Sequence, residues 1–106
     1  MKWHDYLFLT ERQRLAVRLA KRPDFYETRE WLELRYKVLR HYGGYCRLCG
    51  IRGGQKDEGG KRAVIQVDHI KPRSKYPHLA LSFKNLQPAC KACNLGKSNK
   101  YHDNWI

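Results

Sequence analysis

The chain has 106 residues, the size of one ordinary domain with a small hydrophobic core. Its 22 lysines and arginines against 10 aspartates and glutamates give a formal net charge of +12 at pH 7. Such an excess favours a polyanionic partner. The basic residues are spread from Arg12 to Lys100, which favours a folded basic surface over a charged tail. A solvated basic surface without a partner is the alternative interpretation.

The N-terminal region lacks the features of a secreted or membrane protein. Its apolar stretch, residues 6–9, is too short for a signal peptide, and no run of about 18 apolar residues exists. We therefore expect a cytoplasmic protein. Cytoplasmic cysteines stay reduced, so the four cysteines indicate a metal site rather than disulfides.

Two helices are predicted in the N-terminal half of the chain. Thr10 and Gln13 form a capping-box pattern, and Pro23 ends the helix that follows. Thr28 caps a second helix, which Gly43-Gly44 stops. Apolar residues recur on this second helix at helical spacing, and we interpret them as core rather than as a stacking surface: Trp31, Leu34, Val38, Leu39 and Tyr42.

The C-terminal half predicts two short strands and a last helix. Residues 53–60 hold two Gly-Gly pairs and are expected to form a loop. Residues 63–68 predict a strand, and residues 71–84 a second loop. Residues 86–89 predict a second strand in which Pro88 requires an edge or an end. A helix is expected from residue 91 to about residue 100.

The four cysteines form two Cys-x-x-Cys pairs, Cys46 with Cys49 and Cys90 with Cys93. Four thiolates suit a tetrahedral zinc site with no open position, so the predicted ion is structural and supplies folding energy. A redox-active pair is the alternative. It is disfavoured because neither pair lies in a thioredoxin-like βαβ context.

Asp68, His69 and Asn94 would come together if the two cysteine pairs bound one metal. Asp68 offers a carboxylate and Asn94 an amide oxygen, and both suit Mg²⁺ or Mn²⁺. His69 can take a proton from water near neutral pH. Neighbours on a strand point to opposite faces, so the strand must end or bulge here for both to serve one site. Taken singly, each residue is more often an ordinary surface, turn or cap residue.

The order and spacing of these motifs resemble the HNH endonuclease family, of ββα-metal fold. The resemblance rests on Cys-x-x-Cys, Val-Asp-His-Ile-Lys-Pro and Lys-Asn-Leu-Gln-Pro-Ala-Cys-x-x-Cys-Asn-Leu-Gly-Lys, between Tyr45 and Lys97. The family's His, Asn and His positions correspond to His69, Asn85 and Asn94, so this chain would be an H-N-N variant.

This resemblance implies an α+β fold. A small ββα-metal (HNH) nuclease core would be stapled by the four-cysteine zinc site and preceded by two α-helices. The expected organisation is an N-terminal helical extension at residues 1–27 and the nuclease domain at residues 28–106, packed as one unit.

The resemblance also implies a role for each site residue. His69 would be the general base, Asp68 and Asn94 would hold one Mg²⁺ or Mn²⁺, and Asn85 would orient the loop between the strands. The implied activity is metal-dependent hydrolysis of DNA phosphodiesters, with nicking as the elementary step and 5′-phosphate and 3′-hydroxyl products. Four basic residues are candidates for DNA contact: Arg73, Lys75, Lys97 and Lys100.

Double-stranded DNA is therefore the expected partner. The likeness to small stand-alone phage members suggests a phage packaging protein such as terminase as a second partner, in the cytoplasm of a bacterial or phage-infected cell. The sequence leaves monomer and homodimer equally open. The alternative function is a non-catalytic zinc-ribbon module that binds nucleic acid, which would not need Asp68, His69 and Asn94.

Overall fold

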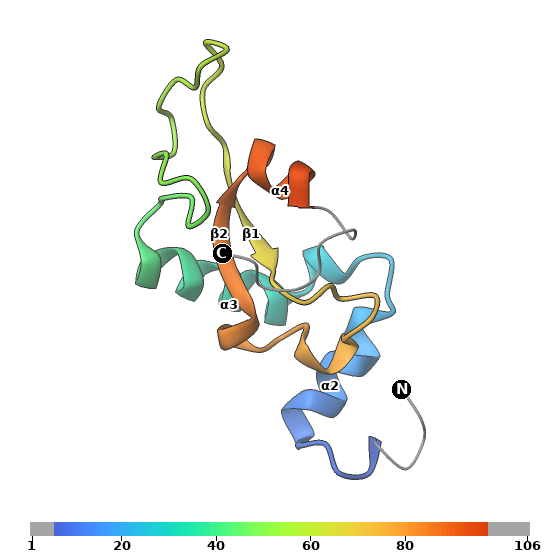
Figure 1. Ribbon diagram of the computed structural model, residues 1–106. Helices are drawn as coiled ribbons and strands as arrows, with labels where there is room; N and C mark the ends of the chain where they lie inside the picture. Colours follow the sequence, from blue (N-terminus) through green and yellow to red (C-terminus); the bar gives the residue numbers. More distant parts are fainter. Residues whose placement is uncertain (1–5, 98–106) are drawn as a thin grey trace.

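The computed structural model describes residues 6–97 of the chain, and Figure 1 shows how its elements are arranged. Its helices are α2 (Glu11–Ala20), α3 (Arg29–Tyr42) and α4 (Lys91–Lys97), and its strands are β1 (Ile65–His69) and β2 (Leu86–Cys90). The part of the chain that the structure describes also holds three short 3₁₀ turns: η1 (Phe25–Glu27), η2 (Pro77–Leu79) and η3 (Phe83–Asn85). The α+β class predicted from the sequence is confirmed.

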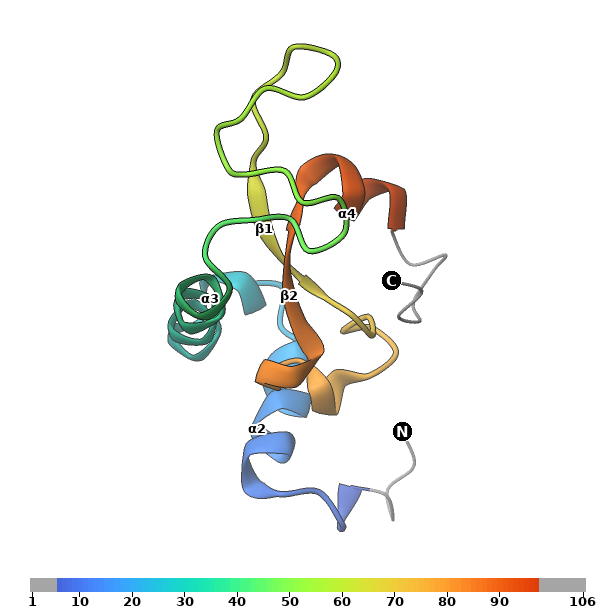
Figure 2. The ribbon, with the colours of Figure 1, turned by 60° about the vertical axis from the view of Figure 1, so that its left-hand side comes forward.

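The two strands pair antiparallel, and α3 and α4 lie on opposite sides of them (Figure 2). The register pairs Ile65 with Cys90 at one end and His69 with Leu86 at the other. Helix α4 follows β2 without a linker, since Cys90 ends the strand and Lys91 begins the helix. The chain thus forms a ββα unit backed by α3.

Helices α2 and α3 begin where their caps predict. The Thr10 hydroxyl accepts the N–H of Gln13 at 3.1 Å, and the Gln13 side chain accepts the N–H of Thr10 at 2.9 Å. The Thr28 hydroxyl accepts the N–H of Trp31 at 3.3 Å. These bonds satisfy N–H groups that have no partner within the helix. Helix α3 ends at Gly43, whose φ of 82° is left-handed.

One hydrophobic core joins the N-terminal helix to the ββα unit. Helix α2 contributes Ala16, Leu19 and Ala20 to the same buried cluster as Trp31 of α3 and Val67 of β1. The predicted division at residue 27 falls between residues of this shared core, and it stays a prediction. Within the described residues, no helix is both long enough and apolar enough to span a bilayer.

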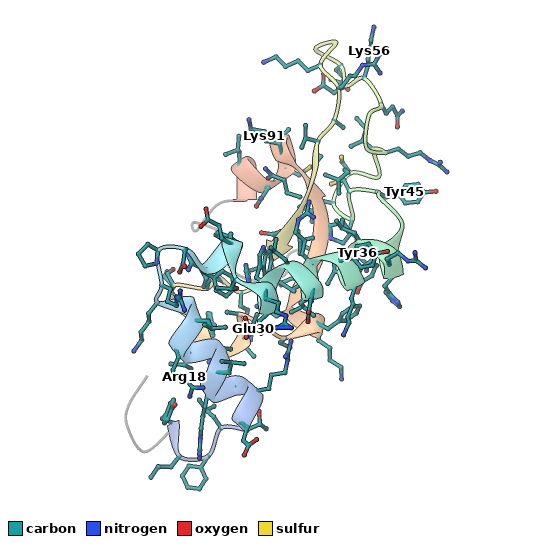
Figure 3. All side chains as sticks on the ribbon, turned by 180° about the vertical axis from the view of Figure 1, so that it is seen from behind. Arg18, Glu30, Tyr36, Tyr45, Lys56 and Lys91 are labelled. Atoms are coloured by element: carbon teal, nitrogen blue, oxygen red, sulfur yellow. The ribbon has the colours of Figure 1, made fainter. Side chains whose placement is uncertain are left out.

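The segment between α3 and β1 extends beyond the sheet as a long loop (Figures 1 and 2). Lys56 lies at its tip, and the Tyr45 ring projects outward near its base (Figure 3). Isolated bridges pair Tyr45 with Arg52 and Lys56 with Arg62. The loop predicted at residues 53–60 is confirmed. It forms the outer part of the longer loop between α3 and β1, which begins and ends beside the cysteines.

Candidate active site and metal centre

The four cysteines meet where this long loop begins and where β2 passes into α4. Their sulfur atoms all lie within 4.8 Å of one another. The Sγ atoms of Cys49 and Cys90 are 3.8 Å apart, far beyond a disulfide bond of about 2.05 Å. Tetrahedral zinc with Zn–S bonds of about 2.3 Å requires sulfurs about 3.8 Å apart. The donor set and its spacing therefore fit a structural zinc ion.

Backbone N–H groups of the first Cys-x-x-Cys turn point at the sulfur of Cys46. The N–H groups of Leu48 and Cys49 each lie 3.4 Å from it. Burial raises the pKa of the Cys46 thiol, but N–H donors from Cys90, Cys49 and Leu48 outweigh it and lower that pKa to about 6. Burial, together with the neighbouring cysteine sulfurs, raises the pKa of Cys93. One thiolate thus forms readily, and a bound cation would favour the remaining three.

The four-cysteine cluster sits in an apolar shell that ties it to the sheet. Leu48, Ile51, Ala63 and Ile65 pack against the buried cysteines. The N–H of Arg47, between the first two cysteines, donates to the carbonyl of Pro88 in β2 at 2.9 Å. The four-cysteine cluster is therefore fixed directly to the strand that leads into α4.

Asp68 and Asn94 are both held by glutamines of the sheet. The Gln87 Nε2 donates to Oδ2 of Asp68 at 3.2 Å, across a directly opposed pair of β1 and β2. The Asn94 Nδ2, from α4, donates to Oε1 of Gln66 at 2.9 Å. Gln66 and Asp68 share one face of β1 because alternate residues of a strand point the same way. The structure thus brings the two predicted oxygen ligands to the same face, the one that α4 covers.

His69 is the last residue of β1. The residue is 7% exposed, and its ring stacks on that of Trp31 with centroids 5.1 Å apart and planes at 21°. The Nε2 atom lies 3.0 Å from the carbonyl oxygen of Ala80. A carbonyl can only accept, so Nε2 carries a proton and Nδ1 is the basic nitrogen of the neutral ring.

Asp68 and His69 face different sides of the strand. The Asp68 carboxylate meets Gln87 on the α4 side, whereas the His69 ring meets Trp31 of α3 and lies 5.9 Å from the Phe25 ring. The strands pair in unbroken register through both residues, so no bulge turns one toward the other. A substrate that engages both side chains must therefore bind across the end of β1.

Asn85 fastens the segment that follows β1. Its Oδ1 accepts the N–H of Lys71 at 2.9 Å, and its Nδ2 donates to the carbonyls of Lys71 at 3.1 Å and Leu79 at 3.2 Å. Its own carbonyl accepts the N–H of Ile70 at 2.8 Å. Asn85 is 6% exposed, so these bonds are shielded from water. They hold the chain immediately beyond His69.

Two of the four predicted DNA-contact residues can be placed. Lys75 is exposed, while Arg73 is partly buried and lies against two aromatic rings. The side chain of Lys97 and the whole of Lys100 lie outside the described residues, as does any part of the last helix beyond residue 97.

The sequence interpretation missed Gln66 and Gln87. A signal was available for Gln66, since strand alternation places it on the face of Asp68. Gln87 becomes visible only once the register of β1 and β2 is known. The Ala80 carbonyl that fixes the His69 tautomer has no side-chain signature, so no pattern of residues could have indicated it.

Comparison with known proteins places this site in a known family. Residues 46–100 match the protein family described as HNH endonuclease. The Septu protein PtuB of Bacillus thuringiensis is 34% identical over 61 residues, which are 58% of this chain and 22% of that relative. The chain therefore corresponds to less than a quarter of the length of this relative. No solved structure matches the chain significantly.

Proposed function

Because the chain belongs to the HNH endonuclease family, we propose that it is a metal-dependent endonuclease that hydrolyses phosphodiester bonds of double-stranded DNA. The observation that carries the proposal is the state of His69. Its Nε2 is committed to the Ala80 carbonyl, so Nδ1 is basic, and the ring stands at the strand end directly after Asp68. A net charge of +12 supports a polyanionic substrate.

In the proposed mechanism His69 acts as the general base. Its Nδ1 takes a proton from the water that attacks phosphorus in line with the leaving 3′ oxygen. The bond from Nε2 to the Ala80 carbonyl strengthens as the ring becomes charged, which favours proton uptake. Stacking on Trp31 restricts rotation of the ring. One base serves one phosphodiester, so each encounter yields one nick with a 5′-phosphate and a 3′-hydroxyl.

Asp68 and Asn94 are the proposed ligands of a catalytic Mg²⁺ or Mn²⁺. They supply a carboxylate and an amide oxygen on one face of the sheet, and such ions complete their shell with water and substrate phosphate. When bound, the ion would stabilise the negative charge that develops on the phosphate and on the leaving oxygen. Asn85 is proposed to fix the backbone next to His69. The zinc centre would set the position of α4 and hence of Asn94.

Conversion of supercoiled plasmid to the nicked form tests the proposal. Zinc-loaded protein should nick the plasmid when Mg²⁺ or Mn²⁺ is added to metal-free buffer and should be inactive without either ion. DNA ligase, which joins a 5′-phosphate to a 3′-hydroxyl, should reseal the product. DNA binding without nicking, with both ions and across near-neutral pH, would instead favour the non-catalytic zinc-ribbon module. We also propose a phage packaging protein such as terminase as a partner, because the chain resembles the small stand-alone phage members of the family.

A further inference from the structure

We propose that Gln66 and Gln87 are positioning residues that orient the two oxygen ligands of the catalytic metal ion. Gln66 would set the direction of the Asn94 amide, and Gln87 that of the Asp68 carboxylate. The assignment rests on the proposed function and adds to it the groups that prepare the metal site before the ion arrives. Residues behind metal ligands commonly have this effect and are worth tenfold or more in affinity.

Gln66 decides which end of the Asn94 amide is presented to a cation. Its Oε1 accepts from the Asn94 Nδ2 at 2.9 Å, so the NH₂ end of Asn94 is turned toward β1. The Oδ1 of Asn94 therefore points away from Gln66 and keeps its lone pairs for another partner. With the Gln66 amide as it stands, the opposite orientation of Asn94 would set two carbonyl oxygens against each other and offer a metal ion an NH₂ group, which cannot coordinate it.

Gln87 fixes the carboxylate of Asp68 from the neighbouring strand. The two residues are direct cross-strand partners, and the Gln87 Nε2 donates to one carboxylate oxygen, Oδ2, at 3.2 Å. Gln87 is 2% exposed and Asp68 is 8% exposed, so bulk water competes little for this bond. A carboxylate held by one oxygen has a restricted side-chain rotation, and its other oxygen takes a defined direction.

The two hydrogen bonds make one polar layer between the sheet and α4. Gln66 and Asp68 come from β1, Gln87 comes from β2, and Asn94 comes from the helix. Burying such groups costs free energy unless each is paired. Pairing for stability alone would also be satisfied with the Gln66 and Asn94 amides both reversed, since the Gln66 NH₂ would then donate to the Asn94 Oδ1. A positioning role requires in addition that metal affinity falls when the glutamines lose their amides.

Mn²⁺ binding to zinc-loaded protein without DNA provides the test, with free Mn²⁺ measured by electron paramagnetic resonance. Gln66→Met and Gln87→Met keep the length of the side chain but remove its hydrogen bonds, so each should weaken Mn²⁺ binding about tenfold. Gln66→Glu keeps an acceptor for Asn94 and should bind Mn²⁺ at least as tightly as the wild type. Gln55→Met is the matched control in the exposed loop and should change nothing.

Zinc content and thermal unfolding are measured on each variant, so a loss of fold is not mistaken for a loss of metal affinity. Gln66 is only partly buried, and its variant decides the question if Gln87→Met does not fold. Wild-type affinity in both folded methionine variants would overturn the positioning role while leaving the endonuclease proposal intact. A wild-type protein that neither binds Mn²⁺ nor nicks DNA would overturn both.

Discussion

At the scale of single residues, Arg73 shows a basic side chain committed to the fold. Its guanidinium carbon lies 4.9 Å from the ring centroids of both Phe25 and Tyr26, and its NH1 group donates to the carbonyl of Ala20 at 2.7 Å. These contacts join the segment after β1 to the end of α2 and to η1. The neighbouring Lys75 is exposed. We therefore expect Arg73 to contribute mainly to stability and Lys75 to be available for DNA binding.

Alanine substitutions at Arg73 and Lys75 distinguish a contribution to folding stability from a contribution to DNA binding. Arg73→Ala should lower the free energy of unfolding by about 2 kcal/mol, since it removes a charged hydrogen bond and two cation–π contacts. Lys75→Ala should change that free energy by less than about 0.5 kcal/mol. If Lys75 meets a phosphate, its loss should reduce the slope of log affinity against log salt by about 0.9.

Urea denaturation and DNA titrations at several salt concentrations provide the two measurements. Each variant serves as the control for the other. Equal losses of stability in Arg73→Ala and Lys75→Ala would contradict the packing role of Arg73. An unchanged salt slope in Lys75→Ala would remove that residue from the DNA interface.

At the scale of elements, local signals located the helices better than they located the first strand. Thr10, Thr28 and Gly43 act at the helix ends through contacts with residues three or four positions away, which a sequence displays directly. The strand predicted at residues 63–68 instead spans Ile65–His69. Ala63 is excluded because its N–H and carbonyl pair with Gln55 and Gly54 of the long loop. Such a loop pairing has no local signature.

The left-handed end of α3 gives a test at this scale. Gly43 has a φ of 82°, and its N–H donates to the carbonyl of Leu39 at 2.9 Å. Gly43→Ala should cost about 1 kcal/mol, because a Cβ disfavours that backbone conformation. Gly59→Ala is the control, since Gly59 is not left-handed and its added Cβ would meet Asp57 at an ordinary 3.5 Å. Thermal unfolding followed by circular dichroism compares them, and equal melting temperatures would argue against the cap.

At the scale of the whole molecule, the site depends on contacts between distant parts of the sequence. Spacing alone predicted that the cysteines would meet and that Asn94 would approach the strand of Asp68. Strand alternation already places neighbouring Asp68 and His69 on opposite faces, but spacing could not show that His69 stacks on Trp31, which lies 38 positions earlier. Helices α3 and α4 pack on opposite sides of the two strands (Figure 2), so His69 contacts α3 while Asp68 lies on the side of α4. This arrangement depends on contacts between distant parts of the chain.

Zinc should determine whether this assembly folds. Structural zinc contributes roughly 10–16 kcal/mol in small domains, which equals or exceeds the total stability of an ordinary domain. Removal of zinc by a chelator, or the substitution Cys90→Ser, should therefore unfold the chain. Far-UV circular dichroism and a zinc assay measure this, with Lys91→Ala at an exposed neighbouring position as the control. A folded, zinc-free Cys90→Ser protein would show that the four-cysteine zinc site is dispensable for folding.

The rate of single-turnover plasmid nicking, compared between the wild type and His69→Ala, tests whether His69 is the general base of an endonuclease. Loss of a general base should slow nicking by about 10²- to 10⁴-fold, with zinc content and secondary structure unchanged. His69→Gln fills more of the space beside Trp31 and Phe25, and it serves as the second variant if alanine loosens the core. A folded, zinc-loaded His69 variant that nicks at the wild-type rate would contradict the role of His69 as general base.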